Sequence, residues 1–207
     1  MKDQTIAIID YGAGNLRSVA NAITKLGYQP RITANPNDVL RAPAVILPGV
    51  GAAADTMRSL VAAGMDRVIH QLISEGRPLF AICMGLQVML DASEEGGWHK
   101  CLGVIPGIVR KLSGGGKIPH MGWNQVKQKM AHPIFQGMPD ETSFYFVHSY
   151  YADPEDKSVI AGTTEYGDAF CSVLVKGNLI ATQFHPEKSG GYGLKMYANF
   201  LEMALKC

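Results

Sequence analysis

The sequence contains few cysteines, and no two of them stand at the spacing of a metal site. The four cysteines are Cys83, Cys101, Cys171 and Cys207, with no CxxC pair among them. Structural zinc sites and the disulfide frameworks of small secreted domains both need closely and regularly spaced cysteines. The pattern therefore predicts free thiols and no metal site, and the sequence indicates no cofactor.

Strong charge of one sign and long apolar runs are also absent. The formal net charge is +1, so no overall field favours nucleic acid or an anionic membrane as a partner. No apolar run approaches the length of a membrane span, and the first five residues lack the apolar core of a signal peptide. We therefore expect a cytoplasmic protein. Its 207 residues, without internal repeats or a linker, predict one domain over residues 1–207.

The first half of the sequence alternates short β-branched runs with helical periods. Strands are predicted at residues 6–10, 31–33, 44–47 and 78–82. Helices are predicted at 15–26, in the alanine-rich stretch up to residue 76, and at 84–92. Such alternation predicts a doubly wound α/β unit, in which helices cover both faces of a parallel sheet.

In the second half, β-type runs predominate after residue 97. They lie at 103–112, 143–152, 158–164, 169–176 and 179–184. Gly177 and Asn178 predict a tight hairpin between the last two runs. A closing helix from residue 191 is expected to place one apolar face inward, made of Leu194, Tyr197, Ala198, Leu201 and Leu205. The predicted fold class is α/β: a doubly wound, mostly parallel open sheet flanked by helices, with additional antiparallel strands in the C-terminal half.

A glycine loop from Tyr11 to Arg17 follows the first predicted strand and opens a helix, as a dinucleotide-binding loop does. However, Arg17 occupies the third glycine position, and no acidic residue ends the second strand to hold a ribose. We therefore interpret the loop as a tight turn with Asn15 near the start of the helix.

Cys83 lies between a predicted buried strand and a predicted helix, with Gly85 two residues further on. This is the pattern of a nucleophile elbow, in which a sharp turn lifts the reactive side chain above the sheet. A helix N-terminus next to the sulfur also favours the thiolate. The alternative for an isolated cysteine is a small buried hydrophobic residue, and that interpretation holds for the other three.

Residues 183–187 read QFHPE and end another predicted strand. In an extended segment, residues two apart point the same way, so His185 and Glu187 can touch. If this strand lies beside the strand before Cys83, His185 can take the thiol proton and Glu187 can orient the imidazole. Taken alone, the motif fits a polar strand end equally well.

Residues 48–51 read PGVG and follow a third predicted strand. The backbone amides of Gly49, Val50 and Gly51, together with that of Met84, are predicted to stabilise a developing oxyanion. A plain glycine turn is the alternative.

Together, these motifs resemble those of class I glutamine amidotransferases, which combine a Gly-rich oxyanion strand, a cysteine elbow of the form GxCxGxQ and a C-terminal HPE. Residues 9–16, 48–51, 119–124 and 148–150 further resemble the glutaminase subunits of imidazole glycerol phosphate synthase, in histidine biosynthesis. The resemblance spans nearly the whole chain. Ala81 departs from the glycine that the elbow often carries.

The resemblance implies that Cys83 attacks the side-chain amide of L-glutamine, that His185 relays protons, and that glutamate and ammonia are formed. It implies a heterodimer with a (β/α)8-barrel cyclase subunit, which uses the ammonia to make imidazole glycerol phosphate and AICAR from PRFAR. The substrate-binding residues implied are Gln87, Glu95, Ser149 and Tyr150. The implied partner interface comprises Asn15, His120, Trp123, Asn124, Tyr145 and Lys188.

Two alternatives stay open. The chain could be the glutaminase subunit of another amidotransferase, in surface-sugar, anthranilate or pyridoxal phosphate synthesis. It could instead be a non-catalytic α/β module whose cysteine senses oxidation.

Overall fold

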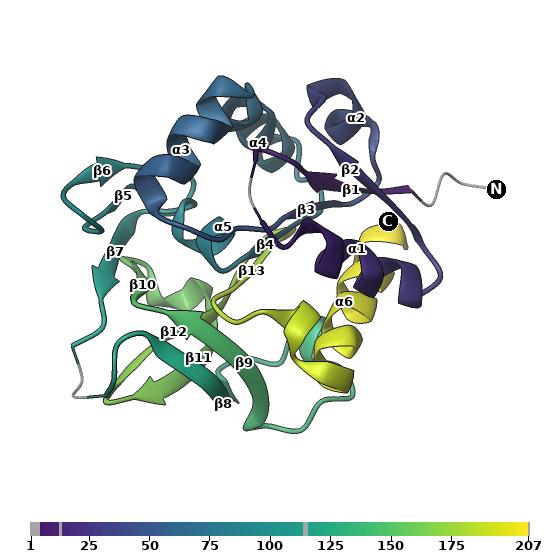
Figure 1. The fold of residues 1–207 in the computed structure, drawn as a ribbon. Helices are drawn as coiled ribbons and strands as arrows, with labels where there is room; N and C mark the ends of the chain where they lie inside the picture. Colours follow the sequence, from purple (N-terminus) through teal and green to yellow (C-terminus); the bar gives the residue numbers. More distant parts are fainter. Residues whose placement is uncertain (1–4, 13, 114–115, 207) are drawn as a thin grey trace.

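The computed structural model describes residues 5–12, 14–113 and 116–206 as a large mixed sheet with helices on both faces and a smaller sheet beside it (Figure 1). The large sheet consists, in spatial order, of β2 (Gln29–Thr33), β1 (Thr5–Ile9), β3 (Val45–Leu47), β4 (Leu79–Ile82), β13 (Leu179–Thr182), β12 (Asp168–Lys176), β11 (Ile160–Tyr166), β8 (His120–Gln128) and β9 (Thr142–His148).

Strand β13 joins the parallel half of this sheet to the antiparallel half. From β2 to β13 every pairing is parallel, and from β13 to β9 every pairing is antiparallel. The predicted hairpin at Gly177 and Asn178 connects β12 to β13, with Lys176 paired to Leu179. The predicted fold class is confirmed, and segments 100 positions apart in the sequence meet where β4 pairs with β13, as Leu79 and Leu179 do.

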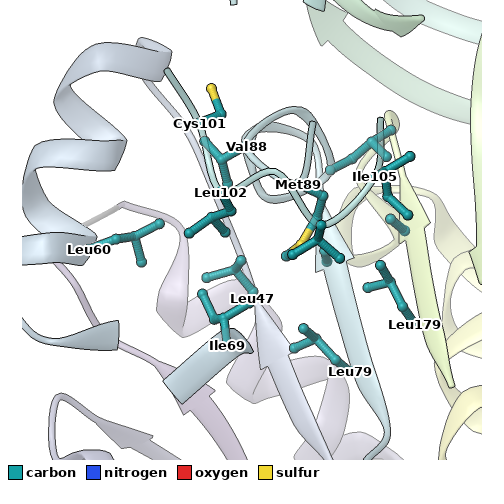
Figure 2. Close-up of a cluster of buried hydrophobic side chains, with 14 of the residues drawn as sticks. Leu47, Leu60, Ile69, Leu79, Val88, Met89, Cys101, Leu102, Ile105 and Leu179 are labelled. Atoms are coloured by element: carbon teal, nitrogen blue, oxygen red, sulfur yellow. The ribbon is translucent and has the colours of Figure 1, made fainter. Parts of the chain in front are cut away.

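Helices cover both faces of the parallel half, as the continuous apolar strands predict. Helices α1 (Leu16–Lys25) and α6 (Gly190–Leu205) pack on the face that includes Ile6 and Ile8. Helices α3 (Ala53–Ala62) and α4 (Met65–Ser74) pack on the other face. Figure 2 shows Leu60 and Ile69 of these helices gathered with Leu47 of the sheet.

A short helix, α2 (Pro36–Arg41), was not predicted from the sequence. Its start carries a local signal nevertheless, because the Asn35 side chain caps it by accepting from the amide of Asn37 at 2.9 Å, directly before Pro36. None of the helices that the structure describes is long and apolar enough to cross a membrane.

The predicted helix at 84–92 is wrong in length: α5 (Met84–Gln87) is a single turn. The carbonyls of Val88, Met89 and Leu90, which a longer helix would use internally, accept hydrogen bonds from the backbone of residues 102–105. This loop buries Leu102 and Ile105 beside Met89 (Figure 2). Long-range backbone pairing therefore replaces the helical turns that the apolar pattern predicted.

The predicted strand at 143–152 is two strands that belong to different sheets. Strand β9 ends at His148, and β10 (Tyr150–Pro154) pairs with β7 (Gly107–Lys111) in the small sheet, which also holds β5 (Ala92–Ser93) and β6 (His99–Lys100). Ser149 is the residue at which the chain changes sheets. Strand β8 was missed altogether, because its exposed polar positions do not resemble a buried strand.

Candidate active site

Cys83 occupies a strained turn between β4 and α5. Its backbone adopts φ 54° and ψ −106°, which a residue with a Cβ adopts only when the surroundings enforce it. The Cys83 amide donates to the carbonyl of Thr182 at 2.7 Å, which ties the turn to β13. A Cβ at Gly85 would lie 2.4 Å from the Leu47 carbonyl oxygen, so only glycine fits there. The predicted nucleophile elbow is thus present in the geometry.

His185 and Glu187 follow β13, the neighbour of β4 in the sheet. Nδ1 of His185 lies 2.7 Å from Oε1 of Glu187, and both side chains are buried. Nε2 makes no regular hydrogen bond within the described part of the chain, and the imidazole lines the same cavity as Cys83. One nitrogen of the ring is therefore fixed by a carboxylate while the other is available to the thiol.

The charge of the site favours a protonated imidazole. Burial lowers the pKa of His185, but hydrogen bonding and charge at Cys83 and Glu187 outweigh burial and raise it from 6.5 to about 10. The imidazolium is thus held between the sulfur of Cys83 and the carboxylate of Glu187.

Two further side chains hold Glu187. Asn15 donates from its amide nitrogen to Oε1, and the hydroxyl of Tyr197 donates to Oε2 at 3.4 Å. Burial, followed by the Glu187 charge, raises the pKa of Tyr197 well above its ordinary value, so the phenol remains a donor. Asn15 was predicted at the partner interface, which stays a prediction, and the structure places its half-buried side chain on the carboxylate of Glu187.

A cavity of about 330 Å³ opens beside Cys83 and His185. This volume is at the small end of the range for small-molecule sites. It is lined by Val50, Gly51, Cys83, Met84, Gln87, Glu95, Pro119, Val147, His148, Ser149, Tyr150 and His185. The cavity thus brings together all four predicted substrate-binding residues and three of the four predicted oxyanion residues.

The walls of the cavity are fixed by contacts to neighbouring elements. Gln87 is buried and donates to the carbonyl of Tyr150 at 2.8 Å, while its own Oε1 has no partner among the described residues. Glu95 accepts from the amide of Ala53 at 2.8 Å, at the start of α3. Both side chains line the cavity, and each is held in place by a backbone group of a neighbouring segment.

Gly49 differs from the other predicted oxyanion residues, since it is not among the residues that line the cavity. A Cβ at Gly49 would lie 2.6 Å from the amide nitrogen of Gly85 and 2.7 Å from Cβ of Met84. Residues 48–51 are thus packed directly against the elbow through this glycine. Among the described residues, no three His, Cys, Asp or Glu side chains gather as metal ligands.

The predicted interface residues divide into exposed and buried ones. Trp123 is 59% exposed and meets the ring of Tyr145 edge-on at 6.3 Å, and the Lys188 ammonium lies 5.9 Å from that ring. Asn124 donates to the carbonyl of Glu165 at 2.9 Å. His120, in contrast, is buried, with 3% of its surface exposed, and its place at the partner interface stays a prediction.

A buried histidine pair adjoins the cavity, which His148 lines. His120 Nδ1 lies 3.0 Å from His148 Nε2, and His148 Nδ1 lies 2.9 Å from the Tyr150 carbonyl. Burial lowers the pKa of His120 to about 4 and that of His148 to about 3, so both rings are neutral. Gln183 is also buried here, with its amide nitrogen 3.6 Å from the sulfur of Cys83. Sequence reasoning assigned no catalytic or binding role to His148 or Gln183.

Comparison with known families identifies the class. Residues 7–204 match the family model of class-I glutamine amidotransferases. Two solved structures from Thermotoga maritima share the fold: PurLQS (TM-score 0.75, 17% identity, covering 97% of this chain and 99% of that one) and a glutamine amidotransferase (TM-score 0.68, 15% identity, 100% and 85%). The chain belongs to the class I glutamine amidotransferase family.

Closer relatives narrow the class. The chain is 60% identical over 200 residues to the imidazole glycerol phosphate synthase subunit HisH of Dehalococcoides mccartyi strain CBDB1, covering 97% of this chain and 98% of that one. It is 50% identical over 198 residues to the protein of the same name from Moorella thermoacetica, covering 96% and 94%. Within its family, the chain is thus similar to HisH subunits over nearly its full length.

Proposed function

We propose that the chain hydrolyses L-glutamine to glutamate and ammonia with Cys83, His185 and Glu187, as the glutaminase subunit of imidazole glycerol phosphate synthase in histidine biosynthesis. The observation that carries this proposal is a buried imidazole whose Nδ1 is held 2.7 Å from Glu187, in the same small cavity as a strained cysteine. Membership of the family and the similarity to HisH subunits support the substrate and the pathway.

In the first half-reaction, the Cys83 thiolate attacks the side-chain carbonyl carbon of glutamine. The new oxyanion would be stabilised by the backbone amide of Met84 and by amides of residues 49–51, and one such donor can contribute about 3–4 kcal/mol to the transition state. Protonated His185 then gives its Nε2 proton to the leaving nitrogen. Ammonia departs and a glutamyl thioester remains on Cys83.

In the second half-reaction, neutral His185 takes a proton from water, and the resulting hydroxide attacks the thioester carbonyl. The carbon–sulfur bond breaks, glutamate leaves, and the proton returns the site to its thiolate–imidazolium form. Glu187 holds Nδ1 throughout, which keeps Nε2 directed at the reacting atoms. Gln87, Glu95, Ser149 and Tyr150, which line the cavity, would hold the amino-acid end of the substrate.

We further propose that the ammonia passes to a (β/α)8-barrel cyclase subunit bound as a heterodimer, in the cytoplasm. The relatives are named as subunits of a synthase, which supports a partner. The exposed Trp123, flanked by Tyr145 and Lys188, supports a docking surface there, since aromatic residues are frequent anchors at interfaces.

A glutaminase assay tests the proposal. Glutamate release is measured for the chain alone, with a barrel cyclase and its ribonucleotide, and with synthases of anthranilate, pyridoxal phosphate or surface-sugar pathways. We expect stimulation only by the cyclase, and loss of at least about a thousandfold in Cys83→Ala, as for other nucleophiles that act within a triad. Stimulation by another synthase alone would reject the assigned pathway, and full activity of Cys83→Ala would reject the nucleophile.

A further inference from the structure

Gln183 is a fully buried polar residue that lies next to the reactive sulfur. It follows β13, two residues before His185, and its exposed fraction is 0%. Its amide nitrogen lies 3.6 Å from Sγ of Cys83, within hydrogen-bond distance for sulfur. Burying a carboxamide costs free energy unless its polar atoms are hydrogen-bonded, so the partners of Gln183 determine how its amide is oriented.

The contacts of Gln87 fix which end of Gln183 faces the sulfur. Nε2 of Gln87 donates to the Tyr150 carbonyl at 2.8 Å, and a backbone carbonyl can only accept. The same nitrogen donates to Oε1 of Gln183 at 3.1 Å. With its oxygen on Gln87, Gln183 must present its N–H to Cys83.

The Tyr150 carbonyl is itself anchored on a second side. A neutral His148 that donates from Nδ1 to this carbonyl must accept at Nε2, and therefore receives the Nδ1 proton of His120. Nε2 of His120 then accepts from the amide of Asn124 at 3.3 Å. Each hydrogen bond from Asn124 on β8 through His120 and His148 to the Tyr150 carbonyl is therefore donated in the same direction. Because this carbonyl is held in place, Gln87 and the Gln183 amide that contacts it have fixed orientations.

From this network we propose that Gln183 is a catalytic residue whose amide N–H stabilises the thiolate of Cys83, and that Gln87 positions it. The inference rests on the proposed function in so far as Cys83 is the nucleophile there. A neutral donor stabilises the sulfur anion without exchanging a proton with it. The proton of His185 is thereby left for the departing nitrogen.

The test measures the rate at which iodoacetamide alkylates Cys83 in the full-length chain between pH 5 and pH 10, followed by mass spectrometry of the peptide containing this residue. Gln183→Met keeps the length of the side chain and removes the donor. Gln183→Glu keeps an acceptor for Gln87 and removes the donor to Cys83. This second variant tests the same contact if Gln183→Met does not fold. Ser172→Ala is the matched control, because the Ser172 hydroxyl is equally buried and makes no hydrogen bond within the described residues.

We expect the midpoint of alkylation to rise by about one pH unit in Gln183→Met, since a hydrogen bond to a charged group is lost. The plateau rate at high pH should rise about threefold, because a less stabilised thiolate is more nucleophilic. Gln183→Glu should raise the midpoint further, and Ser172→Ala should leave it unchanged. A folded Gln183→Met or Gln183→Glu variant with the wild-type midpoint would overturn the inference. Because alkylation needs no glutamine, this outcome is separate from failure of the glutaminase assay.

Discussion

At the scale of single residues, the carboxylate of Glu187 depends on two donors from outside its own motif. Tyr197→Phe removes one hydroxyl and keeps the edge-on contact of this ring with Phe80. We expect glutaminase activity of the complex to fall a few-fold, and about tenfold in Asn15→Ala, because a donor to a charged group is lost in each. Tyr192→Phe, on an exposed position of α6, is the control and should retain full activity. Equal activities in all three variants would contradict this role.

The buried histidine pair makes the fold sensitive to acid. Since the pKa of His148 is about 3 in the folded chain and the ordinary value is 6.5, the unfolded chain binds more protons between these limits. Stability is therefore lost as pH falls below about 6.5, with a slope from this group of up to about 1.4 kcal/mol per pH unit. The free energy of unfolding, measured with urea between pH 4 and pH 7, should depend less steeply on pH in His148→Gln than in the wild type. His70 is exposed, so His70→Gln should keep the pH dependence of the wild type. The same pH dependence in His148→Gln and the wild type would exclude His148 as the source of the acid sensitivity.

Residues that carry local patterns could be found in the sequence, and residues defined by distant contacts could not. The elbow around Cys83 and the spacing of His185 and Glu187 are visible within seven or fewer consecutive letters. The contact of Gln183 with Cys83 joins residues 100 positions apart, and Asn15 and Glu187 are 172 apart. No local period encodes such pairs, because they depend on which strands become neighbours.

At the scale of elements, the start of α6 packs closely against the turn that follows the proposed base, His185. A Cβ at Gly193 would lie 1.9 Å from the carbonyl oxygen of Pro186, in the 3-10 turn Pro186–Lys188. We expect Gly193→Ala to lower the free energy of unfolding by about 1–3 kcal/mol. Glutaminase activity should fall about a hundredfold, because the turn that holds His185 and Glu187 must shift.

Gly191→Ala is the matched control in the same helix. A Cβ at this position meets nothing within 4 Å. Alanine should stabilise the chain by about 0.5–1 kcal/mol, since glycine is a poor helix former. Thermal unfolding and the glutaminase assay on both variants check the pair. Similar losses of stability and activity in Gly191→Ala and Gly193→Ala would contradict the importance of the close contact between Gly193 and Pro186.

The order of the parallel elements was predictable, while their ends were not. Apolar runs such as residues 6–10 and 44–47 fill both faces of a strand, and this pattern is specific to a covered sheet. The end of α5 and the break at Ser149 depend on backbone partners in residues 102–105 and in β7. An apolar segment alone therefore predicts burial but not which partner satisfies its backbone.

At the scale of the whole molecule, the two tryptophans provide a paired test of the docking surface. Trp123 on β8 is 59% exposed, and Trp98, in the segment between β5 and β6, is 66% exposed. Figure 1 places these strands in different parts of the molecule. We expect Trp123→Ala to weaken binding of the barrel cyclase by about 2–4 kcal/mol, measured by calorimetry. Trp98→Ala should bind like the wild type, and the reverse result would move the interface to the small sheet.

The pairing of β4 with β13 also orders events during synthesis of the chain on the ribosome. Its register joins Leu79 to Leu179 and Ile82 to Thr182, so half the chain must still be translated after β4 before its neighbour exists. Until then β4 has an open apolar edge, which other chains can pair with. A polypeptide released before codon 185 would contain the sulfur of Cys83 and lack the proposed base, His185.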